Sequence, residues 1–432
     1  MQTDPASPHH PVGYAVSRWW DDPYSRGAWS ALKVGASAAA RETLGQPISP
    51  RLMLAGEYTH PGQAGMTHGA YEEGRRAAEY CLAWGYGAVL VAGAGFAGLA
   101  AAAWLNDAAG VQVTVLEARS RIGGRVHSVT LDGMAVELGA NWLQQGARNG
   151  LRDLADAAGL AHIVTDFHKP LDLGPPERVP GRDADMLAAH LRQHIAALTG
   201  PDVALLQVVE GWIAGARTDA SAAAMRAMVD VEIVLDSGVP LDEMSARFSW
   251  EPGVGEGDSW LKDGYGSLQM LLAEGLDIRL EHPVKAVRHD ANGVSVSGGF
   301  GSLSGDAVIM AVPAAVIKAG AIAFDPPLPQ DKHSALGLIA TGQVEKVVLQ
   351  FEERWWPVSA SGYLRTLGAE PGLVSEWLDM TDTAGQPVIT GIFAGKWAGD
   401  LWTGKTDAEV AKATAEVLHE AMEASAGRRA GT

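Results

Sequence analysis

The stretch that decides the fold reads VLVAGAGFAGLAAAAWL and covers residues 89–105. Its apolar beginning predicts a buried strand, and its alanine-rich second half predicts a helix. Gly93, Gly95 and Gly98 stand between the two as G-x-G-x-x-G, a spacing that is informative only between a strand and a helix. The first glycine makes a tight turn, the second lets the backbone approach a pyrophosphate, and the third lets helix and strand pack closely. We therefore expect a dinucleotide-binding unit with the pyrophosphate at the helix N-terminus.

The residues that follow indicate which dinucleotide binds. Glu117 ends a second predicted strand, VQVTVLEA, nineteen positions after Gly98, where a carboxylate would accept hydrogen bonds from ribose hydroxyls. The next segment, EARSRIGGRV at 117–126, resembles the FAD-binding signature of the flavin amine oxidase superfamily. The resemblance implies a loop in which Gly123 and Gly124 let the backbone approach FAD and Arg125 supplies a positive charge for its phosphates, with Arg119 in the same site.

Length, composition and charge describe a globular protein of more than one domain. A chain of 432 residues exceeds the roughly 250–300 at which a single core stops growing, so we expect two domains. No run approaches the ~18 apolar residues of a membrane span, the first residues lack a secretory signal, and one cysteine excludes a disulfide framework. The net charge of −18 argues against nucleic acid as a partner. We expect a cytoplasmic protein with no membrane partner, and we leave a homodimer open.

Most of the chain resembles monoamine and polyamine oxidases of this superfamily. The segments that carry the resemblance are 18–30 (RWWDDPYSRGAWS), 54–74, 135–144 (AVELGANWLQ), 263–297 and 307–357. The resemblance implies an α/β fold with a Rossmann-like FAD-binding domain and an α+β substrate domain. It places the FAD-binding domain at 12–147 and 262–314, the substrate domain at 148–261 and 315–424, and flexible tails at 1–11 and 425–432.

The order of these segments is unusual. Those at 18–30 and 54–74 resemble two segments that end the chain in most relatives, whereas here they precede the strand at Val89. The resemblance therefore implies a circular permutation, with the usual C-terminal segment moved to 12–86. Ends of compact domains often lie close together on the surface, so a join at 84–88 need not disturb the core. A mis-spliced or artificial fusion is the alternative.

The resemblance also assigns the catalytic positions. Lys346, in GQVEKVVLQF, matches the lysine that holds a water near the flavin, and a lysine in an apolar strand is costly without partners. The alternative places Lys346 on the solvent face of its strand. Trp29 matches one aromatic wall of the cage that holds the amine. Met66 stands at the partner position, where monoamine oxidases have a tyrosine, so the second wall of the cage stays open.

Further cofactor contacts are implied between the buried strand that we predict at 51–58 and the helix that we predict at 69–85. The residues that would meet FAD at its N-terminus, where the partial positive charge suits the flavin pyrimidine or phosphates, are Gly56, Glu57, Met66 and Thr67. Val284 lies where the family places a backbone contact to adenine. Ala28 occupies the position of the cysteine that bonds the flavin in mammalian-type monoamine oxidases, and the single cysteine, Cys81, lies elsewhere. We therefore expect non-covalent FAD.

The substrate is less well defined than the cofactor. Asn141, Trp142 and Gln144 are expected at the entry of the substrate cavity, together with Trp29. L-amino-acid oxidases of the superfamily carry an arginine near this strand, and here Arg148 comes several residues later. Polyamine oxidases often carry a glutamate at the position of Gln144. Neither pattern is intact, so we expect an apolar or aromatic primary amine.

The implied reaction is oxidation of an amine to an imine and then an aldehyde, with O2 reduced to H2O2. The partners are a small-molecule amine or amino acid and O2, and we assign no metal site. The alternatives are an L-amino-acid oxidase, a polyamine oxidase and a flavin-binding scaffold without activity. A demethylase of protein substrates ranks last, because the chain lacks a long helical insertion.

Overall fold

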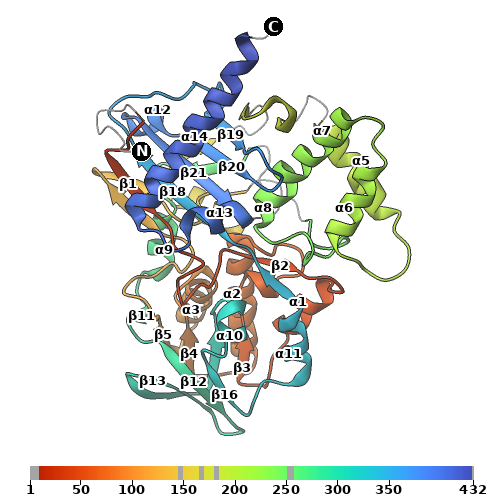
Figure 1. Ribbon diagram of the computed structural model, residues 1–432. Helices are drawn as coiled ribbons and strands as arrows, with labels where there is room; N and C mark the ends of the chain where they lie inside the picture. The colour runs from red at the N-terminus through yellow and green to blue at the C-terminus, as the bar shows by residue number, and fades with distance from the viewer. Residues whose placement is uncertain (1–8, 145–148, 165–169, 180–183, 251–256, 431–432) are drawn as a thin grey trace.

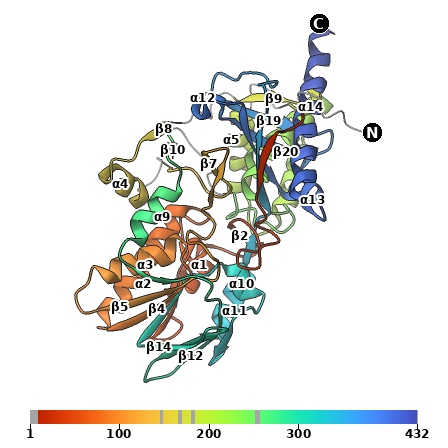
Figure 2. The same ribbon diagram turned by 90° about the vertical axis from the view of Figure 1, so that its left-hand side faces the viewer.

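The structure is a computed structural model that describes residues 9–144, 149–164, 170–179, 184–250 and 257–430. One half of the molecule is built on a parallel sheet and the other on a mostly antiparallel sheet (Figure 1, Figure 2). This is the mixed α/β architecture that the sequence predicts. Among the described residues, no helix combines the length and the apolar character that a membrane span requires.

The parallel sheet holds the G-x-G-x-x-G segment. Its five strands lie in the order β11-β5-β4-β15-β3, with bounds β3 (Leu52–Leu54), β4 (Ala88–Ala92), β5 (Gln112–Leu116), β11 (Asp277–Arg279) and β15 (Ala307–Met310). The central strands are apolar throughout because both faces of a parallel sheet are covered. Helices α2 (Thr67–Ala83) and α3 (Phe96–Asn106) cross closely, since a Cβ atom at Gly74 would lie only 2.0 Å from the carbonyl oxygen of Ala97.

Smaller elements surround this sheet. A four-stranded sheet has the order β14-β13-β12-β16, with β12 (Val284–His289), β13 (Val294–Gly298), β14 (Gly301–Gly305) and β16 (Ala323–Asp325). Two-stranded pairs are β2 (Ser30–Leu32) with β17 (Ile339–Thr341), and β6 (Ser128–Leu131) with β7 (Met134–Glu137). The helices of this half include α1 (Ala38–Gly45), the 3-10 turn η1 (Glu57–Thr59), α9 (Gly266–Ala273), α10 (Ala314–Lys318) and α11 (Gln330–Gly337).

The second half is built on a six-stranded sheet in the order β1-β18-β21-β20-β19-β9. Its strands are β1 (Gly13–Val16), β9 (Leu171–Leu173), β18 (Val344–Gln350), β19 (Tyr363–Leu367), β20 (Val374–Asp379) and β21 (Val388–Ala394). The register pairs Lys346 with Ile392 and Ile392 with Glu376. Residues paired in this way lie on one face of a sheet, so these three side chains share a face.

Helices cover the rest of this half. On the face opposite Lys346, apolar residues of the sheet pack with α13 (Gly395–Trp402) and α14 (Asp407–Ala430). Beside the sheet lie α5 (Ala184–Ala196), α6 (Leu205–Ala214), α7 (Asp219–Val229), the π-helix η3 (Asp230–Val234) and α8 (Leu235–Ser237) (Figure 1). The remaining elements are α4 (Gly150–Ala157), β8 (His162–Val164), η2 (Pro176–Arg178), β10 (Ser259–Leu261) and α12 (Thr381–Ala384).

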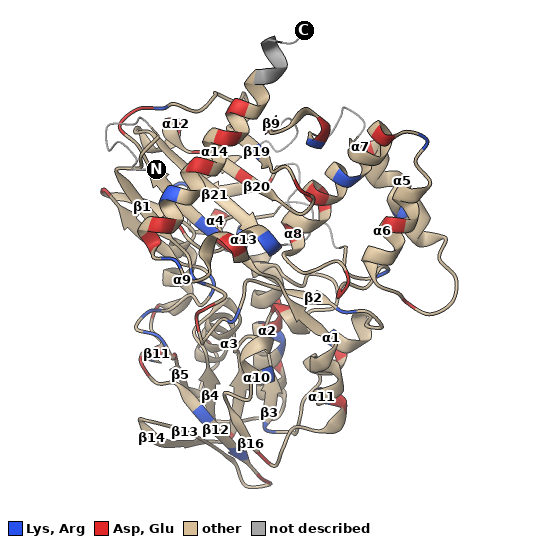
Figure 3. Ribbon diagram, in the orientation of Figure 1, with Lys and Arg blue, Asp and Glu red and all other residues tan. Residues whose placement is uncertain are grey.

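Two sequence-based boundaries are wrong. Helix α14 continues to Ala430, whereas the predicted flexible tail begins at 425. The tail contains alanines and arginines, which are good helix formers, and Gly427 interrupts the helix too weakly to end it. The buried strand predicted at 51–58 shortens to β3, because Glu57 already begins the turn η1. Acidic residues lie along α14 among a few basic ones (Figure 3), in keeping with the net charge.

The residues on both sides of β1 lie beside the last two helices, α13 and α14. The ring of His9 stacks on His419 of α14, with ring centroids 4.0 Å apart. Arg18 pairs with Asp407 at 2.6 Å, and the indole of Trp402 donates to the carbonyl oxygen of Ser17 at 2.8 Å. At the other junction, residues 84–87 connect α2 directly to β4.

Candidate active site

A cavity of about 420 Å³ lies between the two halves and brings most of the predicted site residues together. The predicted residues that line it are Trp29, Gly56, Glu57, Met66, Thr67, Gly93, Gly95, Glu117, Arg119, Gly123, Gly124, Arg125, Asn141, Trp142, Gln144, Val284 and Lys346. Gly98 is the exception. A Cβ atom there would lie 1.8 Å from the carbonyl oxygen of Gly93, so Gly98 permits the close packing of α3 on β4. Arg148 lies outside the described residues.

One end of the cavity has the shape and the donors that a dinucleotide needs. Gly95 precedes the first turn of α3, so free backbone N–H groups face this end. The carboxylate of Glu117 accepts from the backbone N–H groups of Ala94 and Arg119, both at 2.8 Å, which holds the glycine turn against the end of β5. Gly124 approaches Gly95 so closely that a Cβ atom would lie 3.2 Å from its Cα. These residues fit the pyrophosphate and ribose of FAD.

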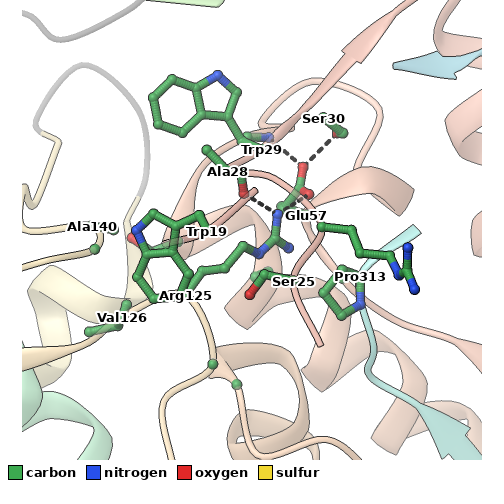
Figure 4. A pocket seen from close by; sticks show the side chains of 18 of the residues that line it. Trp19, Ser25, Ala28, Trp29, Ser30, Glu57, Arg125, Val126, Ala140 and Pro313 are labelled. Atoms are coloured by element: carbon green, nitrogen blue, oxygen red, sulfur yellow. Dashed lines mark hydrogen bonds and ion pairs between the residues drawn. The ribbon is translucent and has the colours of Figure 1, made fainter. Parts of the chain in front are cut away.

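Glu57 is the centre of a buried charged network at the middle of the cavity (Figure 4). Its carboxylate accepts from Ser30 Oγ at 2.6 Å and from the backbone N–H of Gly65 at 2.8 Å. Arg125 Nη1 lies 3.1 Å from Glu57 Oε1 and also donates to the carbonyl oxygen of Ala28. Burial alone would raise the pKa of Glu57, but the positive charges of Arg125 and Arg41, with these hydrogen bonds, lower it.

This network revises what we expected of Arg125. The sequence assigned its guanidinium to the phosphates of FAD, and the structure places it against Glu57 and Ala28. The two residues are 68 positions apart in the chain, and their contact joins the segment around η1 to the Gly-Gly-Arg loop. The residue spacing within either segment carries no information about this contact, so the sequence did not predict it.

Lys346 lies at the other end of the cavity, on the inner face of β18. Its side chain is buried, with 7% exposed, so the solvent-face alternative is wrong. Lys346 Nζ donates to the carbonyl oxygen of Gly139 at 2.7 Å and to Asn141 Oδ1, and it lies 5.0 Å from the centroid of the Trp142 ring. Burial lowers the pKa of Lys346 to about 8. Two of its three N–H groups are engaged, which leaves one for a water or a substrate.

Aromatic and sulfur-containing side chains form the walls near Lys346. The indole N–H of Trp29 donates to the carbonyl oxygen of Asp236 at 3.1 Å, which fixes the orientation of the ring. Gln144 Nε2 lies 2.9 Å from the sulfur of Met66. The structure therefore brings Trp29, Met66, Trp142 and Gln144 into one cavity, as the sequence predicted for each of them separately.

Two carboxyl groups in this cavity were not predicted. Glu376 lies on β20 in the register of Lys346, and its Oε1 accepts from the hydroxyl of Tyr363. Asp236 lies on α8, directly after the π-helix η3, and π-turns inside helices often occur at functional sites. Burial raises the pKa of both carboxyl groups. For Asp236, the negative charge of Glu376 adds to this increase. The signal that could have found Glu376 is the alternation along 374–379, which places Glu376 on the same face of its strand as the apolar residues Val374 and Leu378.

Glu345, next to Lys346, also has a structural role that the sequence did not reveal. Its side chain lies on the opposite face of β18 and is 1% exposed. The carboxylate accepts from the backbone N–H groups of Trp19 at 3.0 Å and Trp20 at 2.8 Å, and from the hydroxyl of Ser17. The segment at 18–30 is thus attached to β18, which positions Ala28 and Trp29 at the cavity.

Comparisons with known proteins agree with this geometry. The profile of the family described as flavin containing amine oxidoreductase matches residues 5–82 and 96–430. Polyamine oxidase 4 of Oryza sativa subsp. japonica is 30% identical over 364 residues, which cover 72% of this chain and 68% of the relative. Lysine-specific histone demethylase 2 of Homo sapiens is 28% identical over 362 residues, which cover 73% of this chain and 41% of that protein. A solved structure of wild-type putrescine oxidase bound to putrescine has the same fold, with a TM-score of 0.59 at 21% identity over 78% of this chain and 82% of the other.

Proposed function

This chain belongs to the family of flavin containing amine oxidoreductases, and from that premise we propose that it oxidises amines with a second positive charge, such as diamines or polyamines. It is an amine oxidase with FAD as its cofactor. The observation that carries the proposal is the pair of carboxyl groups, Asp236 and Glu376, in the same cavity as Lys346. An ammonium group of the substrate would neutralise charges that are otherwise costly to enclose.

The chemistry divides between the cofactor and the chain. FAD, when bound, supplies the acceptor for the hydride equivalent that leaves the amine α-carbon. In balance, the amine loses two electrons and two protons to become an imine, and O2 takes up both as H2O2. Water then hydrolyses the imine to a carbonyl compound and ammonia or a smaller amine. The residues that would hold FAD are Gly93, Gly95, Glu117, Gly124, Val284 and the amides that begin α2.

The residues around the reacting amine have distinct tasks. The rings of Trp29 and Trp142 exclude water, and an apolar surrounding lowers the pKa of the reacting ammonium group, so more of it is neutral. Lys346, held by Gly139 and Asn141, would position a water at the flavin. Asp236 and Glu376 would hold the distal ammonium group, which orients the α-carbon toward the cofactor.

The substrate proposal predicts a selective loss in the variants Asp236→Asn and Glu376→Gln. Each variant removes one charge that pairs with the distal ammonium group. The loss of a hydrogen bond to a charged group raises KM by about tenfold. We expect KM for putrescine and spermidine to rise about tenfold in each variant, while KM for benzylamine stays within about twofold. Steady-state peroxide formation by the flavin-loaded enzymes measures both constants.

Glu232→Gln is the matched control. Glu232 lies on η3, one helical turn before Asp236. It is not among the described residues that line the cavity. Its variant should behave as the unmodified enzyme does toward all three amines. Equal losses for putrescine and benzylamine in the Asp236 and Glu376 variants would contradict the proposed role of the two carboxyl groups.

A second candidate substrate is the apolar or aromatic primary amine that the sequence suggested. The observation in its favour is the aromatic surface of Trp29 and Trp142 in the cavity. The same panel of amines distinguishes the two candidates, because an enzyme for aromatic amines should prefer benzylamine to putrescine before any substitution.

Non-covalent FAD also stays a proposal. It is supported by Ala28 at the cavity and by the buried thiol of Cys81, whose pKa burial raises to about 12.

We also propose that the chain is circularly permuted. The packing of His9 and Arg18 against α14 supports this, because it places the start of β1 beside the last helix. Moving residues 1–86 behind residue 432 with a short linker should give a protein that folds and binds FAD, since every strand pair and helix contact can form as before. Far-UV circular dichroism, urea unfolding and flavin absorbance check the result. An insoluble or colourless product would count against the permutation.

A further inference from the structure

A second, smaller cavity of about 90 Å³ adjoins Lys346. Lys346 and Asn141 line both cavities and therefore form part of the wall between them. The second cavity is otherwise lined by residues outside the first, among them Glu137 of β7 and Tyr265 before α9. The proposed function gives this cavity no task.

Glu137 has one engaged and one free carboxylate oxygen. Oε1 accepts from Ser128 Oγ at 2.8 Å and from the backbone N–H of Tyr265 at 2.6 Å. Oε2 is buried and has no hydrogen-bond partner among the described residues. A buried oxygen without a partner is rare in native proteins and requires an explanation such as an ordered water or a nearby cation. Lys346 is the cation that lines the same cavity.

The cavity has the size and the polarity to hold water. A single water needs roughly 10–15 Å³ of such volume and two to four polar partners, so 90 Å³ holds several. Glu137, Asn141 and Lys346 provide polar partners, and Trp260 adds a buried indole N–H that has no partner among the described residues. Ala135, Lys262 and Thr383 also line the cavity and are exposed on the surface, so the cavity lies close to the solvent.

We infer that Glu137 is a positioning residue, which holds the ammonium group of Lys346 in its charged form across the water of this second cavity. The inference rests on the proposed role of Lys346 and deepens it. Glu137 does not line the larger cavity, in which we propose that FAD and the amine bind, so it acts only through Lys346. Exchange with solvent would let Lys346 gain or lose a proton without a path through the bound amine.

The charges around Lys346 agree with this arrangement. Burial lowers the pKa of Lys346, and two negative groups oppose that effect, first Glu137 and then Glu376 of β20. Burial also raises the pKa of Glu137, while the Lys346 charge and the bonds from Ser128 and Tyr265 lower it. The proposed substrate neutralises Glu376 when it binds, so Glu137 is then the acidic partner that continues to support the lysine charge.

The test is a titration of Lys346 in the flavin-loaded protein without any amine. The ¹³Cε resonance of labelled lysine, assigned by its loss in Lys346→Met, should titrate near pH 8 in the unmodified protein. In Glu137→Gln the midpoint should fall by about one pH unit, at the low end of the effect of an opposite charge. Ser128→Ala is the matched control, because it removes a hydrogen bond to Glu137 and keeps the charge, so its midpoint should not move.

The outcomes are distinct. If Glu137 only caps the start of α9 through Tyr265, the Oε1 atom of the Glu137→Gln variant still accepts that hydrogen bond. The midpoint of Lys346 would then equal that of the unmodified protein, and the inference would be wrong. Should Glu137→Gln not fold, a crystal structure of the unmodified protein decides instead: ordered waters between Lys346 and Glu137 support the inference, and a dry cavity overturns it. The titration is made without any amine. A lower midpoint of Lys346 in Glu137→Gln would therefore support this inference even if the unmodified protein does not oxidise diamines, a result that would contradict the proposed substrate.

Discussion

Replacing Lys346 with methionine is expected to leave FAD bound and to slow flavin reduction or its reoxidation by O2 by about 100-fold, the low end of what a positioned proton-transfer group contributes. Methionine fits the apolar strand, so the sheet should keep its structure. What the variant loses is the ammonium group held by Gly139 and Asn141, the group that we propose to position a water at the flavin. Stopped-flow absorbance of the flavin, first without oxygen and then with it, separates the two half-reactions.

Lys412→Met is the control for this experiment. Lys412 lies on the exposed side of α14 and forms a long ion pair, 4.0 Å, with Glu416. Its variant should have the rates of the unmodified enzyme, as expected for an exposed pair. Flavin-loaded Lys346→Met with unchanged rates in both half-reactions would remove Lys346 from the mechanism, whatever the substrate is.

Replacing Glu57 with alanine is expected to destabilise the protein by about 3 kcal/mol, because breaking a buried ion pair leaves an uncompensated charge. Arg125 and Arg41 would both lose their negative partner, and the backbone N–H of Gly65 would lose its acceptor. Urea unfolding of the flavin-free protein measures the free energy of unfolding. Flavin retained after gel filtration measures the second consequence, the loss of the contact that joins η1 to the Gly-Gly-Arg loop.

Glu57 also makes the stability depend on pH in a known direction. Its pKa is lowered in the folded state, so its contribution is present above the pKa of the unfolded chain and is lost as the pH falls through the folded value. The alanine variant should lack this acid-dependent part. Glu243→Gln is the control, since Glu243 pairs with Lys33 at 2.7 Å with both side chains about a third to a half exposed. Its effect should stay below about 1 kcal/mol. An equal effect in both variants would contradict the role assigned to Glu57.

The sequence predicted the cavity residues well where a motif lies within one segment. The strand, the glycine turn and the helix at 89–105 are β4, the turn at Gly93 and α3, and Gly98 has the packing role that the motif assigns to its third glycine. Segments as distant as Trp29 and Lys346 line one cavity, as the resemblance implied. The roles of these residues toward FAD and the amine remain predictions that the variants above test.

Other features depend on contacts that no segment contains. Arg125 pairs with Glu57 because two loops from different parts of the chain meet. Glu345 was not predicted to have a role, and its three hydrogen bonds to 17–20 come from the pairing of β1 with β18. Asp236, Glu376 and Glu137 were not predicted. For Asp236 and Glu137 the local sequence gives no signal, because an acidic residue in a helix or a strand has the same local pattern whether it faces solvent or a cavity.

The sequence by itself determined the dinucleotide-binding unit and the position of a lysine in an apolar strand, because these depend on the periodicity and spacing of residues close together in the chain. The resemblance of the segment at 117–126 to a family signature indicated FAD. Only the tertiary structure decided that Glu376 and Lys346 share a face, that Asp236 joins them, and that Glu137 lies behind Lys346 in a second cavity. The physical reason is that strand register and loop packing bring distant residues together, and a shift of one residue in register would move Glu376 to the other face of its sheet.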